Sequence, residues 1–200
     1  PYLLNAPNII VGRLPNPIVS VSVMTKGSIP VDGGNLILSE SDKEAIIEQN
    51  DKHGDLIKKM IGAEELLECT ERYCLWISDD NYDFALTSPI IKHRITLCEQ
   101  MRLKSKKSAT QKLAKTPYRF GEIRHKETDA IIIPSHSSEN RLYIPIGFVD
   151  KDTVISNSAF AIYDAELWLF SILTSKMHNI WVRTVGGALE TRIRYTNTLC

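Results

Sequence analysis

The sequence has little of what builds a metal centre, a disulfide scaffold or a membrane span. Its four cysteines form no C-x-x-C pair and its five histidines fall at no ligand spacing, so zinc is not expected. Four cysteines in 200 residues are also too few for a secreted disulfide-rich fold, and reduced thiols in a cytoplasm fit best. There is no signal peptide and no apolar run long enough to cross a bilayer. The cysteines are Cys69, Cys74, Cys98 and Cys200.

Familiar catalytic motifs are absent as well. The chain has no G-x-G-x-x-G, no phosphate-binding loop, no nucleophile elbow and no Asn-Pro-Pro-Tyr/Phe stretch of the kind that adenine methyltransferases use. Asp79, Asp80 and Asp83 could hold a metal, although closely spaced acids after a strand usually form a solvated turn. His136 between two serines suggests a hydrolase, but no orienting acid is evident. We therefore expect no catalysis by this chain alone.

Charge is unevenly distributed along the chain although the net charge is zero. Residues 1–86 contain 14 acids and 7 bases, whereas residues 87–200 contain 10 acids and 17 bases. Such asymmetry is typical of a polyanion-binding face. Two solvated surfaces of opposite sign that attract each other would give the same pattern.

The order of predicted elements favours an α+β fold with long helices packed on a mostly antiparallel sheet. Residues 1–38 are rich in Pro, Gly and Asn and predict an extended, loop-rich arm. Residues 39–86 predict an acidic helical segment with one strand at 72–77, and Ser41 with Glu44 matches a helix-capping pattern. Residues 87–200 predict a basic helix followed by the antiparallel sheet, and the whole is expected to form one compact domain. The helical character is expected to continue through 55–62 and 63–68.

Further elements are expected in the second half. Ser88 and Pro89 predict a helix start, with a core stripe at Ile91, Ile95, Cys98 and Met101, and Pro117 predicts its end. Strands are expected at 120–127, 129–134, 141–149 and 153–163, and a largely buried helix at 165–186. The chain starts at Pro1 and stops at Cys200 after a strand-like segment, so we expect a piece of a longer protein.

Basic residues dominate the segment 102–126, which has nine Lys and Arg and one acid, Glu122. A solvated helix face usually mixes signs, so this bias indicates phosphate neutralisation. The DNA-backbone contacts predicted from this and the later basic segments are Arg102, Lys104, Lys106, Lys107, Lys112, Arg119, Arg124, Arg183 and Arg194.

The stretch GGALETRIRY at 186–195 alternates between charged and apolar residues. Read as one last strand, it places Glu190, Arg192 and Arg194 on one face. Glu can accept from cytosine and Arg can donate to guanine, so Glu190 and Arg192 could address one C·G pair. A cross-strand ladder of ion pairs would use the same residues.

Five blocks of sequence, in order, carry a family resemblance. They are GNLILSE (34–40), RYCLWI (72–77), LKSKKSATQKLAKTPYRFGEIR (103–124), SSENRLYIPIGF (137–148) and LTSKMHNIWVRTVGGALETRIRYTNT (173–198). They resemble the region after the catalytic core in MmeI-like, or type IIL, single-chain restriction–modification enzymes. The resemblance implies a target recognition domain that binds double-stranded DNA and sets the sequence that is methylated and cut.

The resemblance also assigns roles and partners. It implies that the parent chain is an adenine-N6 DNA methyltransferase fused to an endonuclease, with S-adenosylmethionine and Mg²⁺ bound outside this fragment, and that residues 1–38 lead in from the catalytic domain. The family commonly has Lys-x-Asp where this chain has Glu190-x-Arg192, which implies the opposite C/G orientation. Ser135 and His136, and Asn157 and Ser158, match further variable positions that the family uses for base readout. Ala188 stands where the family usually has Arg, which removes one contact.

Three functions remain open on these grounds. The first is DNA target recognition. The second is a protein–protein docking module whose acidic half binds a basic partner without direct DNA contact. The third is a small hydrolase around His136, which requires a concave pocket with a nearby acid.

Overall fold

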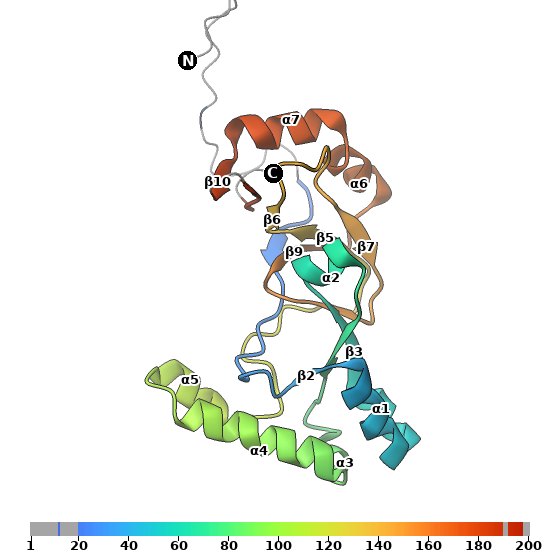
Figure 1. Ribbon diagram of the computed structural model, residues 1–200, viewed down its shortest axis with the longest axis vertical. Helices are drawn as coiled ribbons and strands as arrows, with labels where there is room; N and C mark the ends of the chain where they lie inside the picture. The colour runs from blue at the N-terminus through green and yellow to red at the C-terminus, as the bar shows by residue number, and fades with distance from the viewer. Residues whose placement is uncertain (1–11, 13–19, 190–191, 198–200) are drawn as a thin grey trace, which may run out of the picture.

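Strands from distant parts of the chain form three small sheets in the computed structural model, which describes residues 12, 20–189 and 192–197 (Figure 1). The first sheet has the order β2-β4-β3-β8, the second β1-β9-β5-β7 and the third β10-β11-β6. Every pairing is antiparallel except β3 with β8. The strands are β1 (Met24–Lys26), β2 (Ile37–Leu38), β3 (Ile57–Ile61), β4 (Arg72–Leu75), β5 (Ala130–Pro134), β6 (His136–Ser137), β7 (Gly147–Val149), β8 (Thr153–Ile155), β9 (Ala159–Tyr163), β10 (Gly187–Leu189) and β11 (Arg192–Arg194).

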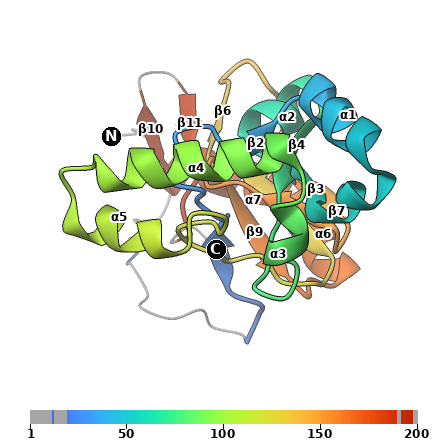
Figure 2. The same ribbon diagram turned by 90° about the horizontal axis from the view of Figure 1, so that it is seen from below.

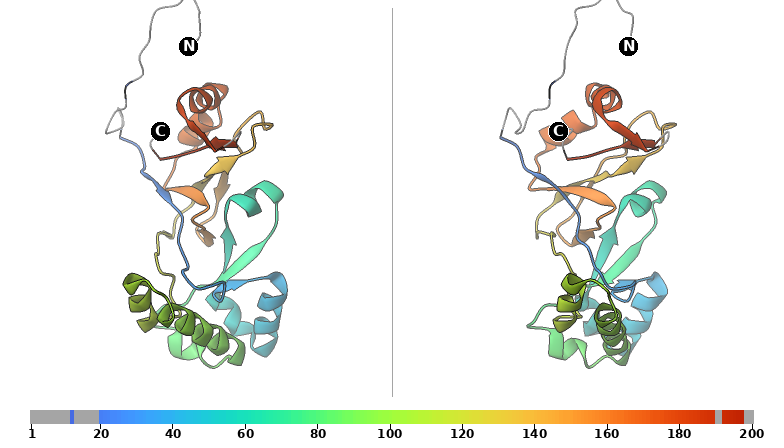
Figure 3. Two further views of the ribbon diagram at one scale, coloured as in Figure 1. Left: turned by 60° about the vertical axis from the view of Figure 1, so that its left-hand side comes forward. Right: turned by 90° about the vertical axis from the view of Figure 1, so that its left-hand side faces the viewer.

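The helices divide between two lobes along the long axis of the molecule (Figures 1 and 3). One lobe, here called the helical lobe, contains the first sheet with α1, α3, α4 and α5. The other, the sheet lobe, contains the second and third sheets with α6 and α7. The helices are α1 (Glu40–Gln49), α2 (Ala63–Glu68), α3 (Tyr82–Ala85), α4 (Pro89–Leu103), α5 (Ser108–Lys112), α6 (Leu167–Leu173) and α7 (Lys176–Val185), with 3-10 turns at Asp51–Leu56 and Leu113–Lys115. The predicted α+β class is confirmed.

Each lobe has its own apolar core. In the helical lobe, Ile91, Ile95 and Cys98 of α4 are buried against Leu36 and Ile46, whereas Met101 is half-buried. The sheet lobe packs Ile131, Ile133 and Ile162 of the central strands against Leu173, Val182, Ile193 and Tyr195. The predicted stripe of α4 is therefore confirmed for its first three positions.

The N-terminal segment 20–38 runs along both lobes and contributes a strand to each. Gly27 shows why a side chain is excluded on this path, since a Cβ there would lie 2.3 Å from the carbonyl oxygen of Ser156. The Ser28 amide donates to the carbonyl of Ile155 at 2.8 Å. The described part of the expected arm, residues 20–38, thus lies on other parts of the protein, as strands β1 and β2 with intervening loops.

Several predicted elements differ from the observed ones in the first half. Helix α1 is capped by Ser39 with Asp42, not by Ser41 with Glu44. Residues 57–61 form β3 and not a helix, because this segment pairs with strands on both sides, β4 and β8. Ser88 and Pro89 do begin α4, and the Ser88 hydroxyl accepts from the Ile91 amide at 3.3 Å.

The second half brings further corrections. Helix α4 ends at Leu103 rather than at Pro117, and α5 folds back beside it (Figure 2). Residues 120–127 form no strand apart from a bridge between Glu122 and Ile29, and 141–149 form one only at 147–149. Residues 165–186 form two helices because Ser175 caps a second one, and their outer face is exposed rather than buried.

Candidate nucleic-acid interface

The third sheet places two arginines on an exposed strand face. In β11, Arg192 and Arg194 are exposed, whereas Ile193 and the following Tyr195 are 8% and 2% exposed. The alternation predicted from the sequence is confirmed for 192–195. The stretch is not one strand, however, because Leu189 of β10 pairs with Arg192 of β11 in a hairpin. Glu190, the predicted acid partner of Arg192, lies outside the described residues.

Strand β6 adds an imidazole beside the second arginine. His136 is the register partner of Arg194, and Ser137 is the partner of Ile193. Directly opposed residues in an antiparallel pair point to the same face. His136 and Arg194 therefore share one face of the sheet with Arg192, and Ser137 lies on the buried face with Ile193.

The turn that joins β8 to β9 lies against the start of β6. The carbonyl of Ser158 accepts the Ser135 amide at 3.2 Å and the Ser135 hydroxyl at 2.5 Å. Asn157 is exposed in this turn, and its amide donates to the carbonyl of Ser28 at 3.1 Å. The structure thus places Ser158 against Ser135, so the turn that carries Asn157 lies beside the start of β6.

Two of these four residues serve the turn itself. Ser135 is 7% exposed and its hydroxyl is bound to Ser158, so its assignment to base readout is corrected to a supporting role. The Ser158 hydroxyl accepts from the Ala63 amide at 2.9 Å and contacts the Ser156 hydroxyl, which ties the turn to α2. Asn157 and His136 keep side chains that reach the surface.

A buried floor fixes the arginine strand. The Tyr195 hydroxyl lies 2.8 Å from Nε2 of His178 in α7, and the Tyr195 amide donates to the carbonyl of Ser135 at 3.0 Å. Burial lowers the pKa of His178, which keeps this imidazole neutral near pH 7. Base readout requires side chains held on a firm scaffold, and α7 with Tyr195 supplies one under β11.

The predicted lysine set forms a separate surface at the other end of the molecule. Lys104, Lys106, Lys107 and Lys112 are all exposed, in the segment that runs from the end of α4 through α5. The ion pairs described in the structure involve none of these four lysines. Such ammonium groups can neutralise phosphates without regard to sequence.

Arg102 does not belong to this surface. Its side chain is fully buried, and its guanidinium donates to five main-chain carbonyls, those of Pro30, Val31, Leu113, Thr116 and Arg119, at 2.7–2.9 Å. The prediction of a DNA-backbone contact is wrong for this residue, because all five of its donors are used internally.

Three other arginines predicted to contact phosphates are half-exposed or exposed, and each has a partner on the protein surface. Arg119 pairs with Asp79 at 2.6 Å, Arg124 pairs with Glu122, and Arg183 donates to the main-chain carbonyl of Arg141. An exposed ion pair such as Arg119 with Asp79 contributes at most about 1 kcal/mol, so a phosphate could replace the carboxylate.

The β10–β11 hairpin and α5 lie toward opposite ends of the long axis of the molecule (Figure 1). Figure 1 has α5 and β10 at its left-hand edge, and the right-hand view of Figure 3 faces that side. Strand β1 runs between them and carries exposed Lys26, whose ammonium lies 5.8 Å from the ring centre of Phe160.

Sequence reasoning missed two basic residues of this region. Lys26 lies in the arm, and a single lysine in a loop-rich segment does not predict a DNA contact. Its place in the sheet follows only from the pairing of β1 with β9. Arg141 is exposed in the loop after β6. Its position directly after the polar segment 134–140 was the available signal.

The hydrolase and metal alternatives lack support in the described part of the chain. The Ser135 hydroxyl donates to a carbonyl, so it can only accept from Nδ1 of His136 at 3.2 Å, the reverse of an activated nucleophile. The two cavities described are lined by α4 and by the Trp76–Phe120 region, away from His136. Asp79 accepts from Tyr118 and pairs with Arg119. No group of three or more His, Cys, Asp or Glu among the described residues could hold a metal ion.

Among the helices described, none is both long and apolar enough to cross a bilayer.

The fold that carries this exposed arginine strand belongs to a known class of domain, the target recognition domain. The family model of the MmeI target recognition domain matches residues 5–200, and the chain belongs to that family. It is 38% identical over 200 residues to DNA methyltransferase A of Bacillus subtilis (strain 168), covering all of this chain and 23% of that protein.

A solved structure gives the same result. The fold matches that of the type IIL restriction–modification enzyme MmeI in complex with DNA, with a TM-score of 0.87 and 35% identity, covering 98% of this chain and 26% of that one. The chain thus spans about a quarter of the length of these relatives.

Proposed function

We propose that this chain reads the base sequence of double-stranded DNA on behalf of a longer restriction–modification enzyme. The family membership and the likeness to MmeI, solved in complex with DNA, support the proposal. The observation that carries it is the exposed face of β11, where Arg194 is the register partner of His136 and Arg192 lies on the same face.

The chemistry of this face fits base edges. An Arg guanidinium donates in bidentate fashion to guanine, an Asn amide matches adenine, and Glu accepts from the amino group of cytosine. Arg192 with Glu190 would address the two members of one C·G pair, and Asn157 with His136 would address neighbouring positions. Lys104, Lys106, Lys107 and Lys112 would bind phosphates and fix the register of the protein on the duplex.

The finer part of the proposal concerns the parent enzyme. Catalysis, namely adenine-N6 methylation and DNA cleavage, would lie in other domains of the same chain, which would bind S-adenosylmethionine and Mg²⁺. Among the described residues no group of three or more His, Cys, Asp or Glu could hold a metal ion, and the sequence has no glycine-rich nucleotide motif. We also propose a cytoplasmic location, where such an enzyme would meet its DNA.

Two variants of the full-length parent test the proposal by separating sequence readout from phosphate binding. Arg192→Ala should reduce discrimination at one base pair by about 1–3 kcal/mol, or roughly 5- to 150-fold, because one bidentate contact is lost. Lys106→Ala should instead weaken binding about equally on all duplexes and lower the slope of log K against log salt by about one. Fluorescence anisotropy with cognate and singly substituted duplexes at several salt concentrations measures both.

The controls define failure. Lys52→Ala, an exposed lysine just after α1 in the acidic half, should change neither quantity. If the parent does not bind duplex DNA even at low salt, the proposal is wrong. If Arg192→Ala and Lys106→Ala behave alike on every duplex, β11 does not read bases.

A further inference from the structure

The imidazole of His136 is held by the protein through one of its two nitrogens. Its Nδ1 lies 3.2 Å from the hydroxyl oxygen of Ser135, and no hydrogen bond in the described part of the chain involves its Nε2. His136 is half-buried, and as the register partner of Arg194 it lies on the exposed face of the third sheet. The second nitrogen is therefore available to a ligand that contacts this face.

A chain of hydrogen bonds fixes which nitrogen carries the hydrogen. The main-chain carbonyl of Ser158 can only accept, so the Ser135 hydroxyl must donate to it across 2.5 Å. Because a hydroxyl has a single hydrogen, the Ser135 oxygen can only accept from Nδ1 of His136. In a neutral imidazole with its hydrogen on Nδ1, Nε2 is a hydrogen-bond acceptor.

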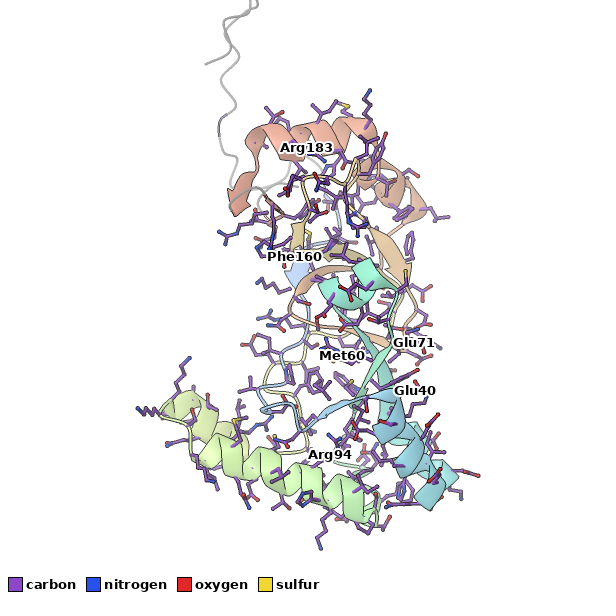
Figure 4. The ribbon with its side chains drawn as sticks, in the orientation of Figure 1. Glu40, Met60, Glu71, Arg94, Phe160 and Arg183 are labelled. Carbon is purple, nitrogen blue, oxygen red and sulfur yellow. The ribbon has the colours of Figure 1, made fainter. Side chains whose placement is uncertain are left out.

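The main chain around this hydrogen-bond chain is fixed as well. The Ser135 amide donates to the same Ser158 carbonyl at 3.2 Å, and the Tyr195 amide donates to the Ser135 carbonyl at 3.0 Å. The rings of Tyr195 and of Phe160, which is labelled in Figure 4, lie 6.4 Å apart between centres in the sheet-lobe core. Such support favours base readout, because a hydrogen bond weakens steeply when its donor and acceptor are misaligned.

An acceptor at Nε2 differs in polarity from the neighbouring side chains. Arg192 and Arg194 are exposed on the same face, and a guanidinium has donors only. In the major groove the amino groups of adenine and cytosine are the hydrogen-bond donors, whereas O6 and N7 of guanine are acceptors. Nε2 of His136 therefore matches an amino group and opposes the acceptors of guanine.

We propose that His136 accepts a hydrogen bond from the exocyclic amino group of adenine or cytosine in the major groove. Ser135 is the positioning residue that selects this tautomer, and it acts on readout through His136 without a DNA contact of its own. This role rests on the proposed function, because it requires the third sheet to face base edges. It adds the direction of the hydrogen bond and the class of base.

Removal of single groups from the bases tests the direction of the bond. The recognition duplex of the full-length parent is first selected from a random library. Each adenine is then replaced in turn by purine and each cytosine by 2-pyrimidinone, which lack only the exocyclic amino group. Fluorescence anisotropy gives the Kd of the wild-type parent and of His136→Ala for every duplex, at pH 8, well above the ordinary histidine pKa of about 6.5.

The two series form a double-mutant cycle at each base. At one base, loss of the amino group should weaken wild-type binding about 5- to 10-fold more than binding of His136→Ala, the effect of one hydrogen bond. Purine or 2-pyrimidinone as the responsive analogue identifies that base as adenine or cytosine. Coupling of His136 to 7-deazaguanine would show instead that Nε2 donates to N7 of guanine, and coupling at no base would show that His136 reads none. Either result overturns the proposal.

Substitution of Ser135 tests its part separately. Ser135→Ala leaves Nδ1 of His136 without an acceptor, so both tautomers become accessible and the coupling to the amino group should fall. Ser135→Thr keeps a hydroxyl and should restore it. A merely structural role would weaken binding alike on all duplexes and leave the coupling intact, which would contradict selection of the tautomer by Ser135.

His93→Ala is the matched control, since His93 is an exposed histidine on α4 in the helical lobe. It should leave the coupling at every base unchanged. A parent that discriminates among duplexes while His136→Ala alters no base preference loses this role of His136 and keeps the proposed function. A parent that binds no duplex even at low salt loses both.

Discussion

Arg102 cross-links distant segments of the helical lobe through its buried guanidinium. Its five donors reach carbonyls of the arm at Pro30 and Val31 and of the segment that follows α5 at Leu113, Thr116 and Arg119. It therefore fixes the chain that carries the exposed lysines against the arm. A planar guanidinium suits this role, because its donors spread in a rigid fork that an ammonium cannot reproduce.

Arg102→Leu should lower the free energy of unfolding by at least about 3 kcal/mol, because several buried carbonyls lose their donors at once. Arg102→Lys should recover only part of this loss. Urea denaturation followed by circular dichroism measures the change. Lys104→Leu, two residues away and exposed, should stay within about 0.5 kcal/mol. A similarly small effect of Arg102→Leu would show that the carbonyls find other donors.

The burial of Arg102 could have been predicted from the sequence. Ile91, Ile95 and Cys98 define the inner stripe of α4, and continuing that spacing reaches position 102 rather than 101. The sequence interpretation followed charge type instead and placed Arg102 with the lysines. Its two partners in the arm, Val31 and Pro30, could not be predicted, because they lie 71 and 72 residues away in the sequence.

At the scale of elements, α7 and β11 form one unit through His178 and Tyr195. Burial lowers the pKa of His178 below its ordinary value. Burial also lowers the pKa of His125, which lies in the loop before β5. A histidine with a lowered folded pKa binds its proton more readily in the unfolded chain. Stability from these groups is therefore present above the ordinary histidine pKa and declines as pH falls below it.

We expect the melting temperature to fall between about pH 6.5 and pH 5, since about 6.5 is the ordinary histidine pKa. His178→Gln should reduce that pH dependence, leaving the part contributed by His125. Differential scanning calorimetry at several pH values measures it. His93→Gln, an exposed position on α4, should preserve the wild-type slope. An unchanged slope in His178→Gln would show that His178 is not coupled to folding.

Elements with strong local signals were predicted well, and those defined by distant pairing were not. Aromatic and β-branched residues predict the strands at 72–75 and 130–134. A Ser-Pro cap predicts the start of α4. Residues 57–61 look helical in isolation and become a strand because β4 and β8 flank them. The hairpin within 187–194 was read as one strand, since no glycine follows Leu189 to indicate a turn.

At the scale of the whole molecule, the chain separates two kinds of cation. Exposed arginines occupy β11 in the sheet lobe, and exposed lysines occupy the segment from the end of α4 through α5 in the helical lobe (Figures 1 and 2). The family resemblance, drawn from five sequence blocks, predicted the recognition-domain family that the family model matches. It could not place the two groups at opposite ends of the molecule, because that depends on packing between segments far apart in sequence.

The most direct measurement is the sequence of the sites that the full-length parent methylates. Glu190 and Arg192 would read one C·G pair, whereas Lys followed by Asp should favour the opposite orientation. Sequencing methylated adenines in DNA from cells that express wild-type or Glu190→Lys/Arg192→Asp parent compares the two. We predict that C and G exchange at one position of the motif while all others stay the same. A methylated motif that is unchanged by the double substitution would contradict base readout by this strand.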